Sequence, residues 1–393
     1  MKVRLGDVCK IQSGGTPSRS EPTYWNHGII PWVKISDIRG KYLNTTEEYI
    51  TEAGLENSTA KIFLSGTILY TIFATLGETC ILNIDAATNQ AIAGIHVESN
   101  LVFNDYLYYY LVSQKDTISK MGRGVAQNNI NMKILREFGV PLPPLDEQRL
   151  IAAVLDNVSD LIAKRRAQLD KLDELVKARF VEMFGDPVTN PHRYPVYQLS
   201  DYIEFLTSGS RGWTQYFSDE GEYFITIKNV KNCRITLDDV QHIVPPDNAE
   251  AVRTKVQEGD LLISITADLG RTGVVTKEIA NHGAYINQHL ACIRLNQKAV
   301  LSLYVACFME SDAGKEQFQA KNQNAVKAGL NFNSINTLRL MVPPIEHQSA
   351  FITFVKQIDK LKLTIQQSLD KLEILKKALM QEYFYIGDDE NDG

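Results

Sequence analysis

Two short loops of small residues, each ending in an arginine, are the first features of this sequence that could do chemistry. The first loop runs over 13–19 (Ser-Gly-Gly-Thr-Pro-Ser-Arg) and the second over 207–211 (Thr-Ser-Gly-Ser-Arg). Small residues let backbone N–H groups approach a phosphate, and a guanidinium binds a phosphate or the edge of a guanine. Such a loop is more often only a turn, but its recurrence in both halves of the chain favours a binding role.

Basic and amide side chains follow both loops at corresponding places. Amides suit the edge of adenine, and Arg or Lys suits guanine. For Asn89-Gln90 and Asn287-Gln288, hydrogen bonding to buried backbone is an equally good interpretation. The DNA-contacting set that we predict is Thr16, Ser18, Arg19, Lys34, Ser36, Arg39, Gln90, Arg123, Gln127, Asn128, Ser210, Arg211, Lys228, Asn229, Lys231, Gln288, Lys327 and Asn331.

Signatures of catalysis are absent from the sequence. It contains no P-loop, no G-x-G-x-x-G and no H-E-x-x-H. No Pro-Pro pair follows Asn or Asp as in an amino-methyltransferase, and no Asp or Glu stands two residues before a Lys as in many nucleases. The histidines are dispersed, and the closest pair, His282 and His289, lies in a region that we expect to be sheet. We therefore predict neither catalytic residues nor a metal or cofactor site in this chain.

An internal repeat organises the whole sequence. Pro-Pro-Leu-Asp-Glu-Gln at 143–148 recurs as Pro-Pro-Ile-Glu-His-Gln at 343–348, and 13 of the 42 positions from 143 to 184 are identical 200 residues later. The segments before each block correspond less closely, as in Leu5-Gly6-Asp7 and Leu199-Ser200-Asp201. The chain is therefore a tandem duplication of a variable globular part followed by a better-matched helical part.

Each repeat ends in a predicted helix of about 40 residues, or about 60 Å. Heptad spacing predicts a coiled-coil seam in each helix, and further leucines widen the apolar stripe. The favoured interpretation is an intramolecular antiparallel pair acting as a spacer; the alternative is that each helix packs on its own globular domain. The seam positions are Leu155, Ile162, Leu169, Val176 and Met183, then Ile358, Ile365, Leu372 and Leu379, widened by Val158, Leu161, Leu172, Leu175, Leu361 and Leu375.

The two variable segments have the composition of strand-rich α+β domains. Short β-branched and aromatic runs alternate with turn residues, and 101–112 and 301–309 are expected to be short helices. We predict domains at 1–142 and 187–342, helical spacers at 143–186 and 343–386, and a disordered acidic tail at 387–393. The fold class is α+β, with two domains alternating with two long antiparallel helices in a pseudo-two-fold internal repeat.

Composition and charge limit the class of protein. The chain has 393 residues, 44% of them apolar, and a net charge of -6, while both variable segments are close to neutral. Five scattered cysteines indicate reduced thiols, and neither a membrane-spanning run nor a secretory signal is expected, so we predict a cytoplasmic protein. Near-neutral domains would bind DNA weakly alone, which favours a subunit that works with partners.

The order of these segments resembles the specificity subunit of type I restriction–modification systems. The features that carry the resemblance are the duplication, the Pro-Pro-Leu/Ile-x-x-Gln motifs, the first loop, and Trp-Val-Lys-Ile-Ser-Asp-Ile at 32–38. It implies that each variable segment is a target recognition domain for one half of a bipartite DNA site. It also implies that the helices set the gap between the halves.

The resemblance also implies partners. Two methyltransferase subunits would dock near the helices and carry S-adenosylmethionine and the adenine chemistry, with restriction subunits able to join. The residues expected to bind these partners are Pro143, Pro144, Leu145, Gln148, Pro343, Pro344, Ile345 and Gln348. The second copy departs from the first in two places: it has His347 where the first has Glu147, and its loop lacks Gly-Gly-Thr-Pro.

Two other functions are weighed against this one. An enzyme acting alone is disfavoured by the absent signatures. A scaffold or interaction protein with paired β-rich binding domains on a coiled-coil spacer remains the alternative, and methylation that depends on an added partner subunit would discriminate against it.

Overall fold

The structure is a computed structural model that describes residues 2–115, 118, 130–322 and 329–384. The chain divides into two compact units, which we describe separately. The first comprises Met1–Arg165 and Ser368–Gly393, and the second comprises Arg166–Gln367. Each unit therefore contains one globular part, the beginning of one long helix and the end of the other.

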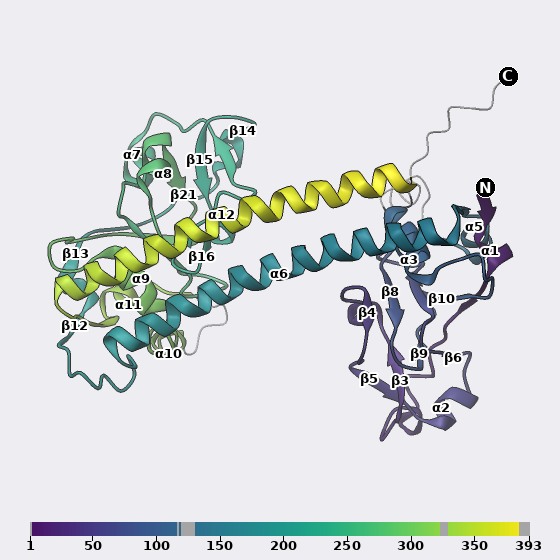
Figure 1. Ribbon diagram of the computed structural model, residues 1–393. Helices are drawn as coiled ribbons and strands as arrows, with labels where there is room; N and C mark the ends of the chain where they lie inside the picture. The colour runs from purple at the N-terminus through teal and green to yellow at the C-terminus, as the bar shows by residue number, and fades with distance from the viewer. Residues whose placement is uncertain (1, 116–117, 119–129, 323–328, 385–393) are drawn as a thin grey trace. The chain divides into compact units, whose positions relative to one another are not determined.

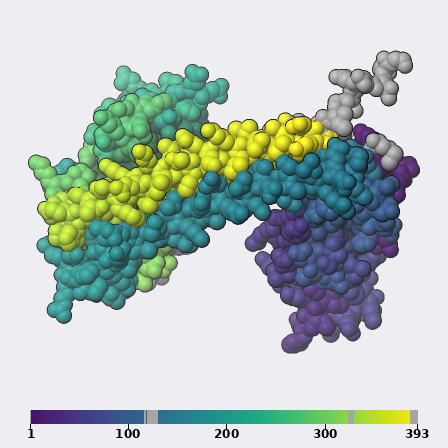
Figure 2. All heavy atoms as spheres, viewed as in Figure 1, coloured from purple at the N-terminus to yellow at the C-terminus, as the bar shows by residue number. Residues whose placement is uncertain are grey.

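The two long helices are α6 (Leu145–Phe184) and α12 (Ile345–Phe384), 40 residues each. In the second unit the end of α6 lies beside the beginning of α12, because Phe184 contacts Phe351 while Asp173 pairs with Lys362 further along. The helices are therefore antiparallel there, as Figures 1 and 2 also show. Gly185, with a φ of +75°, ends α6 in the left-handed conformation that glycine adopts without strain.

The apolar stripe of each helix is narrower than the sequence predicted. Heptad residues such as Leu155, Ile162, Val176 and Ile358 are buried, which confirms the predicted seam at these positions. The additional leucines at 161, 175, 361 and 375 are 44–54% exposed, so the prediction that they widen the stripe is wrong. A helix that packs through a narrow coiled-coil seam leaves the flanking positions in solvent.

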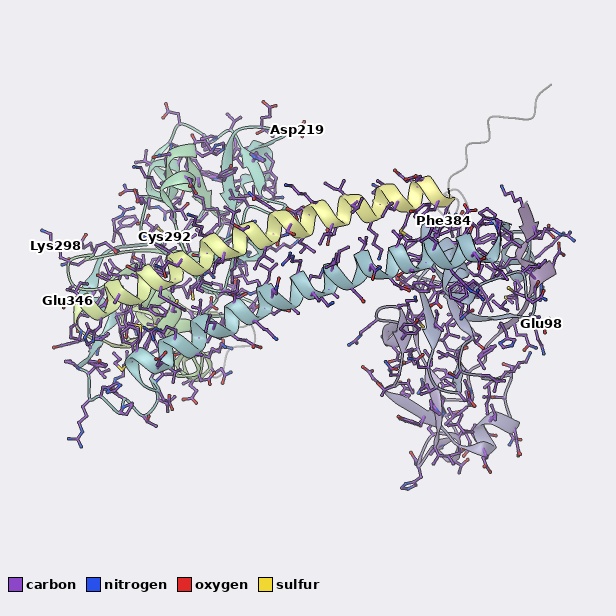
Figure 3. The ribbon with its side chains drawn as sticks, viewed as in Figure 1. Glu98, Asp219, Cys292, Lys298, Glu346 and Phe384 are labelled. Atoms are coloured by element: carbon purple, nitrogen blue, oxygen red, sulfur yellow. The ribbon has the colours of Figure 1, made fainter. Side chains whose placement is uncertain are left out.

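Both packing arrangements considered for the helices occur together. The beginning of α6 packs on the first globular part through Ile151, Ala152 and Leu155, and the end of α12 joins the same core through Phe384 (Figure 3). In the second unit Val176 and Phe180 of α6 and Val355 of α12 pack on the second globular part. In each unit both helices thus pack on a globular part, and in the second unit they also contact one another.

The first unit's globular part is strand-rich. Its described strands are β1 (Lys2–Arg4), β2 (Cys9–Ser13), β3 (Ile30–Val33), β4 (Tyr42–Leu43), β5 (Glu48–Ile50), β6 (Ile62–Phe63), β7 (Ile68–Thr71), β8 (Thr79–Leu82), β9 (Ala86–Thr88), β10 (Ile92–Val97) and β11 (Gly139–Pro141). Its described short helices are α1 (Leu5–Val8), η1 (Pro22–Tyr24), η2 (Ile35–Asp37), α2 (Glu52–Glu56), α3 (Asn104–Ser113) and α5 (Met132–Arg136).

The second unit's globular part is built in the same way. Its described strands are β12 (Val196–Gln198), β13 (Ile203–Ser208), β14 (Phe217–Ser218), β15 (Glu222–Ile225), β16 (Val230–Lys231), β17 (Arg234–Ile235), β18 (Gln241–Ile243), β19 (Leu261–Ser264), β20 (Thr272–Val274), β21 (Ala284–Ile286), β22 (Leu290–Leu295) and β23 (Arg339–Met341). Its described short helices are η3 (Leu199–Tyr202), η4 (Trp213–Tyr216), η5 (Ile227–Asn229), α7 (Ala249–Thr254), α8 (Lys277–His282), α9 (Ser302–Glu310), α10 (Asp312–Lys321) and α11 (Phe332–Asn336).

The central strands of the sheets correspond in the two units. The antiparallel order β2-β10-β7-β8 matches β13-β22-β19-β20, and β5-β3-β9 matches β18-β15-β21. The central pair of the second sheet is parallel in both units, β3 with β9 and β15 with β21. The repeat predicted from the sequence is therefore confirmed in the fold, although few residues of the sheets are identical.

The predicted α+β domains with long antiparallel helices are confirmed. The short helices expected at 101–112 and 301–309 are α3 and α9. His282 ends helix α8 instead of lying in a strand, and His289 lies between β21 and β22. None of the helices in the described part of the chain is both long and apolar enough to cross a membrane. The predicted acidic tail, 387–393, lies outside the described residues.

Candidate DNA-recognition site

The first loop lies against the end of β9 in the first unit. Gly15 donates its backbone N–H to the Thr88 carbonyl at 2.9 Å, and a Cβ on Gly14 would come within 2.4 Å of that same oxygen. Glycine is therefore required by close backbone approach. Beyond it, the Thr16 hydroxyl donates to the Gln90 side-chain oxygen, which brings two predicted residues together.

The second loop has the same position in the second unit. A Cβ on Gly209 would meet the Ile286 carbonyl oxygen at 2.1 Å, and Ser210 donates its N–H to that oxygen at 2.9 Å. The Arg211 guanidinium then donates to the Gln288 side-chain oxygen. In each unit the loop is thus hydrogen-bonded to the glutamine that follows the parallel strand β9 or β21. The loop residue is Thr16 in the first unit and Arg211 in the second.

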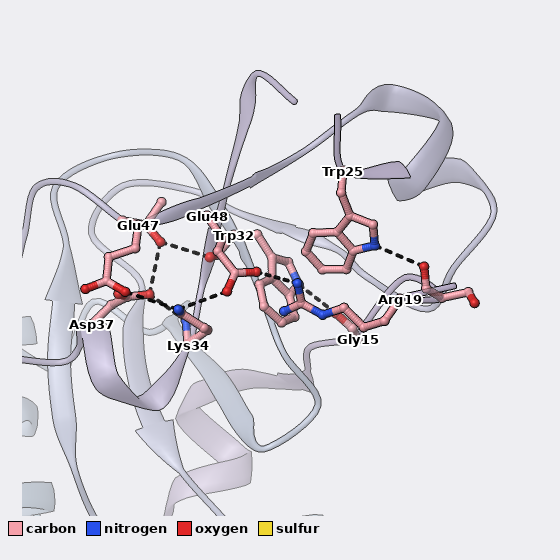
Figure 4. Close-up of polar contacts among 10 residues, drawn as sticks. Gly15, Arg19, Trp25, Trp32, Lys34, Asp37, Glu47 and Glu48 are labelled. Atoms are coloured by element: carbon pink, nitrogen blue, oxygen red, sulfur yellow. Dashed lines mark hydrogen bonds and ion pairs between the residues drawn. The ribbon is translucent and has the colours of Figure 1, made fainter. Parts of the chain in front are cut away.

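Three predicted cations of the first unit converge on two carboxylates at the beginning of β5. Arg19 Nη1 lies 2.6 Å from Glu48, and Lys34 Nζ lies 2.9 Å from Glu48 and 3.1 Å from Glu47. Arg39 Nη2 lies 3.9 Å from Glu47. We call these five residues the carboxylate cluster. Figure 4 labels all of them except Arg39.

Two tryptophans hold the arginine of this cluster. The guanidinium carbon of Arg19 lies 3.7 Å from the centre of the Trp25 ring and 4.9 Å from that of Trp32 (Figure 4). Trp32 is buried and donates its indole N–H to the Gly15 carbonyl at 3.0 Å. Cation–π contacts of this kind fix the direction of a guanidinium that would otherwise move freely.

The charges of the cluster reinforce one another. Hydrogen bonds to Glu48 and Glu47 raise the pKa of Lys34. Partial burial alone would raise the pKa of Glu48, but hydrogen bonds from Lys34 and Arg19 lower it overall. A carboxylate with a lowered pKa stabilises the fold at neutral pH, and this contribution is lost as the pH falls through the lowered pKa.

Glu47, Glu48 and Trp25 were not predicted from the sequence, and Trp32 was noted only as part of the run at 32–38. The predicted set held only the basic, amide and hydroxyl residues that suit contacts to DNA. The adjacent acids Glu47-Glu48, placed directly before a β-branched and aromatic run, were the available signal. Ser18 and Ser36 also lie at this edge: the Ser36 carbonyl accepts from Arg39 Nε at 3.0 Å, and the Ser18 carbonyl accepts from Trp25.

In the second unit the predicted cations are more open. Arg211, Lys228 and Lys231 are exposed, and no ion pair between described residues includes them. Arg253 of α7, which the sequence analysis did not select, donates to the Ser208 carbonyl at 2.9 Å and to the Thr207 hydroxyl. It therefore places a second arginine, besides Arg211, at the second loop.

The prediction that Ser210 and Asn229 contact DNA is corrected, because both side chains are buried. Ser210 is 2% exposed, and its hydroxyl lies 3.0 Å from that of Thr254. Asn229, also 2% exposed, accepts at its side-chain oxygen from the N–H of Thr226 at 3.0 Å. Both side chains satisfy polar groups inside the domain, so neither is available at the surface.

Lys34 and Lys228, the first predicted cations after the two loops, do not occupy corresponding places in the fold. Asp37 closes the first turn of η2 by accepting from the Lys34 N–H, and Asn229 closes η5 by accepting from the Thr226 N–H. Asp37 therefore matches Asn229, and Lys34 matches Thr226. All of these residues lie in or beside 3-10 turns and not on a strand.

Of the remaining predicted contact residues, Asn331 caps a helix and the others lie outside the described residues. The Asn331 side chain is exposed but accepts from the Ser334 N–H at 2.8 Å as the N-cap of α11, as Asn131 does for α5. Arg123, Gln127, Asn128 and Lys327 lie outside the described residues. No three His, Cys, Asp or Glu side chains within the described ranges are grouped as metal ligands.

The glutamines predicted to bind partners are buried inside their own units. Gln148 accepts from the Phe103 N–H at 2.8 Å and donates to the carbonyls of Leu101 and Pro143. Gln348 repeats this arrangement with the Leu301 N–H at 2.9 Å and the carbonyls of Pro343 and Ala299. The prediction that these two glutamines contact partners is therefore corrected: both connect the start of a long helix to α3 or α9.

The other motif residues differ in exposure. Pro144 and Pro344 are exposed, Leu145 and Ile345 are half-buried, Pro143 is half-buried and Pro343 is buried. The exposed prolines remain the part of the motif that a partner could reach.

A cation in each unit also connects the recognition segment to a long helix. Lys41 Nζ lies 2.5 Å from Asp156 of α6 and 2.7 Å from Asp105 of α3. Arg234 pairs with Asp359 of α12 and lies 3.7 Å from Asp173 of α6. Burial alone would lower the pKa of Lys41, but Asp105 and Asp156 raise it overall, so the lysine stays charged.

The fold and this duplicated edge define a class of protein with paired domains of one topology on two antiparallel helices. A family model for the type I restriction modification DNA specificity domain matches residues 1–172 and 194–374. The chain belongs to this family.

Particular relatives agree with that assignment. The type I restriction enzyme MjaIX specificity subunit of Methanocaldococcus jannaschii is 27% identical over 249 residues, which are 58% of this chain and 57% of that protein. The EcoKI specificity subunit of Escherichia coli K12 is 20% identical over 92% of this chain and 83% of its own length. The match thus spans little more than half of the MjaIX subunit. The match to the EcoR124I/EcoR124II specificity subunit of E. coli spans 40% of that protein.

Solved structures show the same fold. A chain from a structural study of assembly and conformational transition in a type I restriction–modification system is similar with a TM-score of 0.58, at 18% identity, over 98% of this chain and 97% of that one. The S subunit of M. genitalium is similar with a TM-score of 0.53, at 14% identity, over 97% and 95%. The fold class and the family resemblance inferred from the sequence are confirmed.

Proposed function

We propose that this chain is the sequence-specific DNA-recognition subunit of a type I restriction–modification enzyme and has no catalytic activity of its own. The observation that carries the proposal is the duplicated edge, where loop, glutamine and cations meet in both units of a chain of this family. Side chains differ between the two edges, with Thr16 beside Gln90 but Arg211 beside Gln288. Different side chains in equivalent places read different bases, so the bipartite site is asymmetric.

The recognition domains of this proposal span 1–142 and 187–342, with spacers at 143–186 and 343–386. Two methyltransferase subunits, which bind S-adenosylmethionine and modify adenine, are directed to the site by this chain, and restriction subunits are able to join this cytoplasmic complex. The helices fix the gap between the half-sites. The relatives named above as specificity subunits support this assignment.

Exchange of one recognition domain tests the proposal. When residues 1–142 are replaced by the corresponding domain of another specificity subunit, we expect one half-site of the methylated sequence to change and the other to stay the same. Long-read methylation mapping of a host that carries the chain and its methyltransferase subunit measures both halves. A change in both halves would contradict the assignment of one half-site to each domain. Methylation by this chain without a partner would contradict the proposed lack of catalysis. Partner-independent binding to protein or glycan would favour the scaffold.

Lengthening the spacer tests the role of the helices. Seven residues inserted after Arg165 and seven after Gln367 add about 10 Å to each helix and nearly preserve the side-chain phase, because seven residues are close to two turns. We expect the gap to grow by about three base pairs at 3.4 Å each. The control is a two-residue insertion at the same places, which turns the apolar faces by about 200° and is expected to abolish site-specific methylation. An unchanged gap after the heptad insertion would show that the helices do not set it.

A further inference from the structure

The carboxylate cluster is unusual for a DNA-binding edge because its positive charges are already matched. Arg19, Lys34 and Arg39 face the carboxylates of Glu47 and Glu48, and every one of the three cations lies within 4 Å of at least one carboxylate. Asp37, whose side chain accepts from the Lys34 N–H at 2.8 Å, adds a third negative charge. The formal charge of this edge is therefore close to zero.

Matched charges weaken sequence-independent binding to the phosphate backbone. A cation that contacts a phosphate releases a counterion and favours any DNA sequence, whereas a carboxylate beside it is repelled by that phosphate. Base edges in the major groove carry both acceptors and amino donors, so a surface with both signs fits them better than it fits the backbone. Non-specific binding is thus disfavoured more than binding to a correct sequence.

The positions of the two acids fit this role. Glu47 is 61% exposed at the surface, while Glu48 is 29% exposed and lies between Arg19 and Lys34 (Figure 4). Trp25 and Trp32 hold Arg19 in place, so the guanidinium is not free to turn toward a neighbouring phosphate. In the second unit Arg211, which occupies the place of Thr16, faces the neutral amide of Gln288 instead of a carboxylate.

We propose that Glu47 and Glu48 are specificity-determining residues of the first recognition domain, which prevent Arg19, Lys34 and Arg39 from binding DNA phosphates without regard to sequence. This inference rests on the proposed function. It assigns the acids a part in discrimination between sequences, and it predicts that the two recognition domains differ in how strongly they bind non-specific DNA.

The test is Glu47→Gln in the full chain, assembled with its methyltransferase subunits. The change keeps the size of an exposed side chain and removes one negative charge. We expect affinity for a duplex lacking the site to rise roughly five- to tenfold at ~0.1 M salt, and the slope of log affinity against log salt to steepen by about 0.9, as for one added phosphate contact. Affinity for the cognate duplex rises less, so the ratio of the two falls. Fluorescence anisotropy across a salt series measures all three quantities.

Glu98→Gln is the matched control, since it removes the same charge from the exposed loop after β10, beside Cys9 (Figure 3). It is expected to leave the ratio unchanged, and Glu47→Asp, which keeps the charge, should behave like the wild type. An unchanged salt slope in Glu47→Gln, an equal effect of Glu98→Gln, or loss of cognate affinity alone would overturn the inference. A wild-type complex with no preference for any sequence would instead overturn the proposed function.

Discussion

Replacement of Gln348 by methionine is expected to destabilise the second unit by about 3 kcal/mol. The side chain is fully buried, and methionine of similar size would leave the Leu301 N–H and the Pro343 carbonyl without their partner. A buried polar group left unsatisfied costs about 1–3 kcal/mol. For a unit of this size the melting temperature should fall by roughly 6–12 °C, measured by calorimetry.

Ser349→Ala is the control for this substitution, because the adjacent serine is exposed and bonds only within its own helix. Its effect should stay within about 0.5 kcal/mol. Gln148→Met should destabilise the first unit by a similar amount, because the Phe103 N–H and the Pro143 carbonyl lose their partner. If Gln348→Met left stability intact but prevented assembly with methyltransferase subunits, the glutamine would be a partner contact after all.

Truncation of Phe184 to alanine is expected to have the largest effect on packing, about 4 kcal/mol. The ring is fully buried at the end of α6, with its centre 5.0 Å from the rings of Phe180 and Tyr304 and 5.6 Å from that of Phe351. Loss of a buried phenylalanine removes burial and leaves a cavity, at a cost of about 3–5 kcal/mol. These rings join both long helices to α9, so the second unit should lose cooperative unfolding at the same time.

Leu175→Ala is the matched control on the same helix. Leu175 is 45% exposed, so its truncation should cost about 0.5 kcal/mol or less. Thermal unfolding followed by far-UV circular dichroism distinguishes the two variants. A loss at Leu175 as large as that at Phe184 would mean that the exposed leucines are covered in the assembled protein.

Much of the architecture could be predicted because its signals are local or repeated. The helix boundaries follow from Pro144 and Gly185, whose backbone preferences act on their immediate neighbours. The seam follows from a seven-residue period, and the duplication follows from identities 200 residues apart. The loops at 13–19 and 207–211 were found because the same small residues recur at corresponding places.

The side-chain partners could not be predicted in the same way. The sequence suggested that Gln148 and Gln348 face partner subunits, whereas both are enclosed by groups about 45 residues earlier in the chain. Ser210 and Asn229 were expected at the surface but satisfy groups in the interior. Polar residue type alone does not show whether a side chain meets solvent or the backbone of a distant loop.

The sequence by itself therefore determined the duplication, the strand-rich domains, the long paired helices and the family. Backbone propensity, hydrophobic period and repeat identity are properties of short stretches, and each can be judged before any long-range contact forms. Only the tertiary structure decided that Arg19, Lys34 and Arg39 meet Glu47 and Glu48, and that each loop meets its glutamine. Those contacts join residues on separate strands and turns, and the pairing of β3 with β5 and β9 brings them to one edge.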